Sequence, residues 1–265
     1  MRKRKIGIFD SGLGGLIIAR AIRRFMPGYD YVYLGDTKNL PYGNKSQAKI
    51  YANTKKALEY LFEHGCVLVI VACNTASSQA LRKIQQEWLP ARNAAHNAAG
   101  GPNSKYKDRK VLGVIRPTVE SIGKSKNVGL IGTVRTVDSK AYKQELYKIN
   151  PKIKLLAKAT PELVPMIEKR ELDIKVLKNY LASFKNTDTL ILGCTHYGLL
   201  KKEIKKILGP KVKIIAQEDI IPGKLKKYLK NHREIRLSKG SGMEFLVTKK
   251  TPSMKGFSPK LISLS

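Results

Sequence analysis

The sequence contains few cysteines, few acidic residues and no long apolar run. Its three cysteines are odd in number and form no Cys-x-x-Cys pair, which excludes a disulfide framework and speaks against a structural zinc site. We therefore expect free thiols and no metal. The longest apolar run, residues 66–73, is too short to cross a bilayer, and the basic start at residues 1–5 leads into glycine and acid before the core of a signal peptide develops. These absences predict a cytoplasmic protein without a membrane partner.

Acidic residues are scarce beside basic ones, 20 against 51, which gives a net charge of +31. A field of this sign attracts nucleic acid, anionic surfaces and small anions alike, and it does not specify a fold. No helix-turn-helix, zinc-finger or RNA-recognition signature accompanies the charge, and the lysines fall mostly on the polar faces of expected helices. We expect a solvated basic surface, with a nucleic-acid-binding protein as the alternative.

The remaining composition is that of a globular chain with a substantial core, since 42% of the 265 residues are hydrophobic and 27% are charged. Short β-rich apolar runs alternate with amphipathic stretches, which is typical of a parallel-sheet α/β protein. The expected strands are 5–10, 31–36, 66–73, 110–115, 127–133, 152–158, 188–194 and 212–216. The expected helices include 15–26, 46–65, 136–149 and 173–184.

The two halves of the chain repeat one another. "IGIFDSG" starts at Ile6 and the similar "VGLIGTV" at Val128, 122 residues later, while Cys73 and Cys194 are 121 residues apart. Nearly equal offsets predict two pseudo-symmetric parallel-sheet α/β domains that face each other across a central cleft. We expect one domain from residues 1–114 plus 217–265, completed by the C-terminal tail, and a second from residues 115–216.

One segment differs from the rest in composition. Residues 91–110 are rich in Ala, Asn, Gly and Lys and lack apolar periodicity, so we expect an exposed, mobile loop in which His96 faces solvent. The tail after about residue 230 keeps its apolar residues and is expected to pack on the protein.

Polar side chains follow four of the expected strands, at the points where these strands end. They are Asp10-Ser11, Cys73-Asn74-Thr75, Thr133 and Cys194-Thr195-His196. Because the carboxyl ends of parallel strands meet at one edge of a sheet, these residues should converge on one crevice.

Two loops add to this expected crevice. The glycines of "DSGLGG" at 10–15 permit a tight turn whose backbone N–H groups can seat a carboxylate or phosphate, but the pattern does not satisfy the dinucleotide fingerprint. "LPYGNKS" at 40–46 is a turn that would present the ring edge and the hydroxyl of Tyr42.

Cys73 and Cys194 stand at expected helix N-termini, where partial positive charge lowers the pKa of a thiol. Cys66, which no polar motif follows, is expected to be a structural core residue. Two thiols on opposite walls of a cleft can remove a proton from one face of a tetrahedral carbon and deliver another to the opposite face, which inverts the centre without a cofactor. A single thiol with a histidine partner, Cys194 with His196, would instead suit a hydrolase.

Six segments of the chain, taken in order, resemble glutamate racemases of the cofactor-independent amino-acid racemase superfamily. They are "IGIFDSGLGGL", "YLGDTKNLPYGNKS", "VACNTAS", "IGTVRTVDSKAY", "LVPMIE" and "LILGCTHYGLL", which run from about residue 6 to residue 204. The resemblance implies a two-base thiol/thiolate mechanism in which Cys73 acts on the D-enantiomer and Cys194 on the L-enantiomer. It also implies that Asp10 assists Cys73, and that His196 and Glu168 assist Cys194.

The resemblance further implies glutamate as the substrate, no cofactor, a homodimer, and a role in supplying D-glutamate for peptidoglycan and hence for the cell wall and cell shape. Aspartate is the alternative substrate. The implied substrate contacts are Asp10, Ser11, Tyr42, Gly43, Asn74, Thr75, Thr195 and His196. The chain departs from the family at Gly198, where proline is usual, at "AQED" (216–219), where an acidic turn is often found, and in the inserted segment 91–110.

Overall fold

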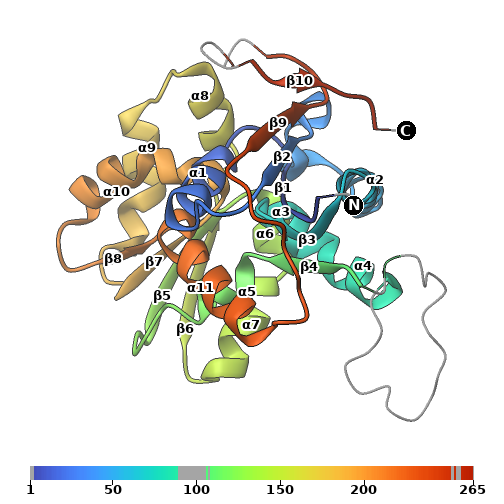
Figure 1. Ribbon diagram of the computed structural model, residues 1–265. Helices are drawn as coiled ribbons and strands as arrows, with labels where there is room; N and C mark the ends of the chain where they lie inside the picture. The colour runs from blue at the N-terminus through green and yellow to red at the C-terminus, as the bar shows by residue number, and fades with distance from the viewer. Residues whose placement is uncertain (1–2, 89–105, 107, 252–253, 255–257, 265) are drawn as a thin grey trace.

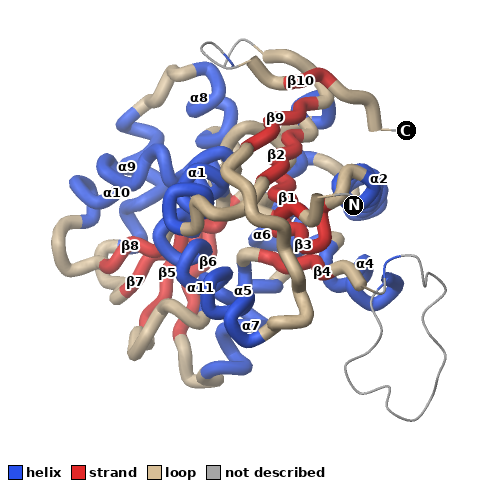
Figure 2. The backbone as a smooth tube through the Cα atoms, viewed as in Figure 1, coloured by secondary structure: helices blue, strands red, loops and turns tan. Residues whose placement is uncertain are grey.

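The chain folds around two parallel β-sheets, as Figures 1 and 2 show for the computed structural model, which describes residues 3–88, 106, 108–251, 254 and 258–264. The strands are β1 (Lys5–Asp10), β2 (Tyr31–Gly35), β3 (Cys66–Val71), β4 (Lys110–Gly113), β5 (Asn127–Gly132), β6 (Lys154–Ala159), β7 (Thr189–Gly193), β8 (Lys213–Ile215), β9 (Met243–Val247) and β10 (Lys260–Leu261). The α-helices are α1 (Leu16–Phe25), α2 (Gln47–Glu63), α3 (Asn74–Gln79), α4 (Leu81–Trp88), α5 (Ile115–Val119), α6 (Val134–Asp138), α7 (Ala141–Ile149), α8 (Leu163–Lys169), α9 (Ile174–Leu181), α10 (Lys201–Leu208) and α11 (Gln217–Asn231). Short 3₁₀ helices cover Thr37–Asn39, Tyr42–Asn44, Ala182–Phe184 and Thr195–Leu200.

The two sheets share one topology. The first has the strand order β10-β9-β2-β1-β3-β4 and the second β6-β5-β7-β8, and the paired strands of each run parallel. With β9 and β10 set aside, the order in both sheets follows the same pattern along the chain, second-first-third-fourth. This confirms the expected pair of parallel-sheet α/β units and the internal repeat.

Each sheet is covered by helices on both faces, which is why its central strands read as continuous apolar runs. Side chains alternate along β1, so that Ile6 and Ile8 pack under α1 and α11 while Phe9 packs under α2 and α4. In the second sheet, α8, α9 and α10 cover one face, and α5 and α7 cover the other. Polar residues lie at the carboxyl ends of four of these strands, β1, β3, β5 and β7.

The C-terminal tail joins the first sheet. β9 pairs with β2 in parallel, with Met243 beside Tyr31, and β10 pairs with β9. The sequence indicated a packed tail but not these two strands. We propose the domain division 1–114 plus 217–265 and 115–216, since α11 packs on the first sheet and α5 on the second.

Two local expectations differ from the structure. The single helix expected at 136–149 is broken into α6 and α7 at Lys140, whose φ is 56°, because Oγ of Ser139 accepts the Ala141 N–H at 3.2 Å and competes with the helical pattern. The loop expected at 91–110 lies mostly outside the described residues, and so does His96. Tyr106, in this segment, is buried against Phe62 and Trp88 and is therefore part of the core.

Candidate functional site

A pocket between the two halves of the molecule holds both expected catalytic thiols. From the first half it is lined by Ser11, Leu40, Pro41, Tyr42, Gly43, Cys73, Asn74 and Thr75, and from the second by Thr133, Val164, Cys194, Thr195 and His196. Every site residue expected from the sequence is in this lining except Asp10 and Glu168, which stand behind it. Cys66 lies in the hydrophobic core, as expected.

The Cys73 side of the pocket is built at the start of α3. Sγ of Cys73 accepts the backbone N–H of Ala76 at 3.4 Å and donates to Oγ of Ser11 at 3.3 Å. Burial, reinforced by the charge of Asp10, raises the pKa of the Cys73 thiol to about 12, although Ser11 and the Ala76 N–H favour the thiolate. The lowered pKa expected from the helix N-terminus is therefore wrong for Cys73, because burial outweighs the single N–H group.

Asp10 lies fully buried behind Cys73 and reaches both halves of the molecule. Its Oδ2 accepts the N–H groups of Gly12 and Gly15, both at 3.1 Å, and its Oδ1 accepts the hydroxyl of Thr195 at 3.3 Å. Burial raises the pKa of Asp10, against the lowering effects of His196 and of these donors. These two backbone N–H groups of the glycine-rich turn therefore donate to Asp10, whereas the sequence predicted that such groups would bind a ligand.

The glycines of this turn allow the two halves to approach. A Cβ atom on Gly14 would lie 2.6 Å from Nδ1 of His196 and from Oγ1 of Thr195, and a Cβ on Gly15 would lie 2.6 Å from Cβ of Asp10. Larger residues at either position would push the acid/base groups apart.

The Cys194 side of the pocket is a chain of a thiol, an imidazole and a carboxylate. Sγ of Cys194 lies 3.8 Å from Nδ1 of His196, whose Nε2 lies 2.6 Å from Oε1 of Glu168. Burial opposes protonation of the imidazole, but the contacts with Cys194 and Glu168 raise the pKa of His196 to about 10. Cys194 is the N-cap residue of the 3₁₀ helix Thr195–Leu200, as expected, but its side chain makes no capping hydrogen bond, and the imidazole of His196 lies beside its thiol.

Tyr42 contributes its ring to the pocket but turns its hydroxyl away. The hydroxyl donates to Oδ2 of the buried Asp36 at 2.7 Å, and Asp36 also receives the amide of Asn39 and the hydroxyl of Thr248. Burial and the neighbouring Asp36 raise the pKa of Tyr42, so that the phenol keeps its proton and remains a donor. The expectation that this hydroxyl faces the ligand is wrong, because it ties the loop to the C-terminal strand.

Replacing Tyr42 by phenylalanine should loosen the pocket loop at residues 40–43. Asp36 loses a donor inside the protein, so we expect the free energy of unfolding in urea to fall by about 1–3 kcal/mol. The same change in the surface residue Tyr147 is the control and should leave stability unchanged. Equal stability of the Tyr42→Phe variant and the native chain would contradict this account of Asp36.

Hydroxyl and amide groups that the sequence did not assign support the pocket lining. Thr133, noted only as a residue at a strand end, lies 2.9 Å from Thr75 through the two Oγ1 atoms. Tyr142 and Gln217 hold the side chain of Asn74, and neither was expected. Gln217 directly follows the strand expected at 212–216, so the rule that found Asp10 and Cys73 would have found it. Tyr142, by contrast, lies within α7 and gives no such signal.

Two features bear on cofactors and membranes. Within the described ranges, no group of three or more His, Cys, Asp or Glu side chains is arranged to hold a metal ion. Among the same residues, no helix is both long and apolar enough to span a bilayer.

Comparison with known proteins places the chain in a family. No family model matches it. It is 39% identical to the glutamate racemase of Aquifex pyrophilus, over 97% of this chain and 93% of the relative, and 35% identical to glutamate racemase 2 of Caldanaerobacter subterraneus, over 94% and 89%. The crystal structure of glutamate racemase from Francisella tularensis in complex with D-glutamate matches with a TM-score of 0.85 at 30% identity, over 100% of this chain and 99% of that one. At these identities and coverages, the chain belongs to the glutamate racemase family.

Proposed function

We propose that this chain interconverts L- and D-glutamate without a cofactor, by a two-base mechanism that uses Cys73 and Cys194. The observation that carries the proposal is one pocket lined by two thiols from opposite halves of the protein, with Asp10 near Cys73 and His196 and Glu168 beside Cys194. Inversion of a carbon centre needs a base on one face and an acid on the other. Relatives named glutamate racemase support glutamate as the substrate, and aspartate is the second choice.

The protonation of the free protein supports a start from L-glutamate. The high pKa of Cys73 makes it a thiol that can give a proton, and the base of this direction is then Cys194, whose Sγ lies 3.8 Å from Nδ1 of His196. The Cys194 thiolate removes the α-proton, so that the Cα–H bond breaks and an S–H bond forms. Cys73 then gives its proton to the opposite face of the carbon, which leaves D-glutamate, a thiol on Cys194 and a thiolate on Cys73. The reverse reaction begins at Cys73.

The neighbours of the thiols would stabilise these changes of charge. Asp10 would assist Cys73, and the His196–Glu168 pair would assist Cys194. The remaining lining offers hydroxyl, amide and backbone groups suited to the two carboxylates and the ammonium group of an amino diacid. We propose as substrate contacts the pocket-lining residues Ser11, Tyr42 through its ring, Gly43, Asn74, Thr75, Thr195 and His196, and we propose that Asp10 acts on the substrate from behind them, through Thr195.

The test is proton NMR of L-glutamate, and then of D-glutamate, with the purified protein in deuterium oxide, while circular dichroism follows the enantiomer. We expect the α-proton signal to disappear and the optical activity to decay to zero from either side. Folded protein with reduced thiols that exchanges neither enantiomer would refute the assignment to glutamate, and L-aspartate would then be tested in the same way.

A hydrolase is the second candidate, because Cys194, His196 and Glu168 form the thiol–imidazole–carboxylate series of cysteine hydrolases. Such an enzyme has no use for Cys73 across the pocket. It would retain its activity in the Cys73→Ser variant and would show a burst of acylation, whereas a racemase would lose turnover.

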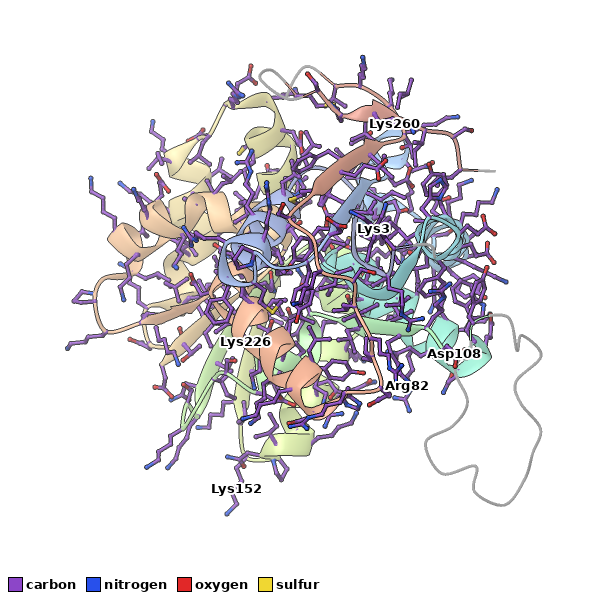
Figure 3. All side chains as sticks on the ribbon, viewed as in Figure 1. Lys3, Arg82, Asp108, Lys152, Lys226 and Lys260 are labelled. Carbon is purple, nitrogen blue, oxygen red and sulfur yellow. The ribbon has the colours of Figure 1, made fainter. Side chains whose placement is uncertain are left out.

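The basic surface favours no single partner. Figure 3 shows side chains around the whole outline of the molecule, with Lys152 and Lys260 at opposite ends of the view. Such a spread is that of a solvated surface, and we propose that any binding of nucleic acid is non-specific and disappears in filter binding at physiological salt. We further propose that the protein works in the cytoplasm as a homodimer and supplies D-glutamate for peptidoglycan.

A further inference from the structure

The side chain of Asn74, next to Cys73 in the pocket lining, is held by a buried network from the other half of the chain. Tyr142 donates its hydroxyl to Oδ1 of Asn74 at 2.6 Å, and Nε2 of Gln217 donates to the same oxygen at 3.1 Å. The Asn74 amide group Nδ2 in turn donates to Oε1 of Gln217 at 3.3 Å, and Nε2 of Gln217 lies 3.2 Å from the Tyr142 hydroxyl. All three residues are at most 2% exposed.

This network gives the Asn74 amide a fixed polarity. Its oxygen already accepts two hydrogen bonds, which is the full capacity of a carbonyl oxygen, whereas its nitrogen has used one of two N–H groups. The group that Asn74 has left for a ligand in the pocket is therefore an N–H donor. A donor suits a carboxylate and not an ammonium group.

Gln217 is itself held in place by the packing of the helix that it begins. It begins α11, which contacts α1, α5 and the 3₁₀ helix Thr195–Leu200 that follows Cys194, and Figure 1 shows α11 beside α5 and α7. The next residue, Glu218, lays its carboxylate over Gly198, where a Cβ atom would come within 2.6 Å of Oε1. Gly198 thus leaves room for Glu218, and α11 is packed against elements that belong to both halves of the molecule.

We propose that Gln217 is a positioning residue that holds Asn74 as a hydrogen-bond donor to a carboxylate of the substrate. The inference rests on the proposed racemase function and adds a residue to it. It explains why a fully buried amide comes just after β8 of the second sheet, with hydrogen bonds to a pocket residue that comes after β3 of the first sheet. It also assigns Asn74 to the binding of charge and not to proton transfer.

The test is Gln217→Met, which keeps the length of the side chain and removes its amide. We expect KM for both enantiomers of glutamate to rise by about tenfold, the equivalent of one good hydrogen bond to a charged group, while kcat stays within about threefold. Gln144→Met, at an exposed position of α7, is the matched control and should leave both constants unchanged. The free energy of unfolding in urea is measured for each variant.

A purely structural role is recognised by its own pattern: Gln217→Met would lose stability while KM stayed the same, and that result would overturn the inference. Calorimetric binding of D-glutamate separates this failure from failure of the proposed function. Native protein that binds glutamate without racemising it would refute the racemase alone, since the loss of affinity in Gln217→Met could still be measured. Native protein that racemises glutamate, with unchanged KM and affinity in Gln217→Met, would refute the role of Gln217 alone.

Discussion

Replacing Cys73 or Cys194 by alanine is expected to lower the racemisation of glutamate by at least about a thousandfold, because inversion needs both an acid and a base. The two thiols line one pocket from opposite halves of the molecule, and no third thiol reaches it, since Cys66 lies in the core. Circular dichroism of L- and D-glutamate measures the loss. Cys66→Ala is the matched control and should stay active.

The two alanine variants should differ in which enantiomer they still exchange. The enantiomers have equal free energies, so kcat/KM must be the same in both directions for every variant, and steady-state rates cannot assign the two faces. Exchange in deuterium oxide can. In Cys73→Ala, Cys194 is still able to remove the α-proton of L-glutamate and return a deuteron to the same face, so L-glutamate should lose its NMR signal while keeping its configuration. Cys194→Ala should do the same to D-glutamate, and the reverse pattern would exchange the roles of the two thiols.

The sequence was informative about the site because strand ends can be recognised from a pattern of apolar residues. Asp10 ends β1, Cys194 directly follows β7 and Cys73 follows β3 after one intervening residue, and parallel strands bring such positions together whatever the rest of the chain does. β9 was not recognised as a strand, because only Leu246 and Val247 of its five residues are buried and its pattern does not stand out.

The sequence did not reveal how deeply the site side chains are buried or in which direction they point. The thiol of Cys73 has a raised pKa because the surrounding core excludes water, and no local motif encodes that exclusion. In the same way, the hydroxyl of Tyr42 turns to Asp36 because a strand from the far end of the chain brings Thr248 to the same carboxylate. Both errors concern contacts between segments distant in sequence, and both change a chemical assignment without moving the residue out of the pocket.

Replacing Glu168 by glutamine is expected to lower kcat by roughly tenfold to a hundredfold at alkaline pH and much less near pH 6. The carboxylate contacts Nε2 of His196 at 2.6 Å and helps to raise the pKa of the imidazole from its ordinary 6.5 to about 10. A neutral amide of the same shape cannot stabilise the imidazolium by charge, so the pKa of His196 should fall. The alkaline limit of kcat/KM should then move from near pH 10 toward neutrality, as pH–rate profiles of both proteins would measure. Glu171→Gln, at an exposed position three residues further on, is the control.

Stability should follow the same titration. Because folding raises the pKa of His196, proton binding favours the folded state, and this contribution is fully present below about pH 6.5 and is lost as the pH rises through about 10. The free energy of unfolding should therefore fall across this window in the native chain, and less steeply in Glu168→Gln.

If both proteins gave the same pH–rate and pH–stability curves, Glu168 would not control the charge of His196. If only the rate profile moved, the carboxylate would act on the reaction and not on the resting imidazole. The proposed mechanism requires both curves to move, since the imidazolium beside Cys194 is the cation that the fold stabilises.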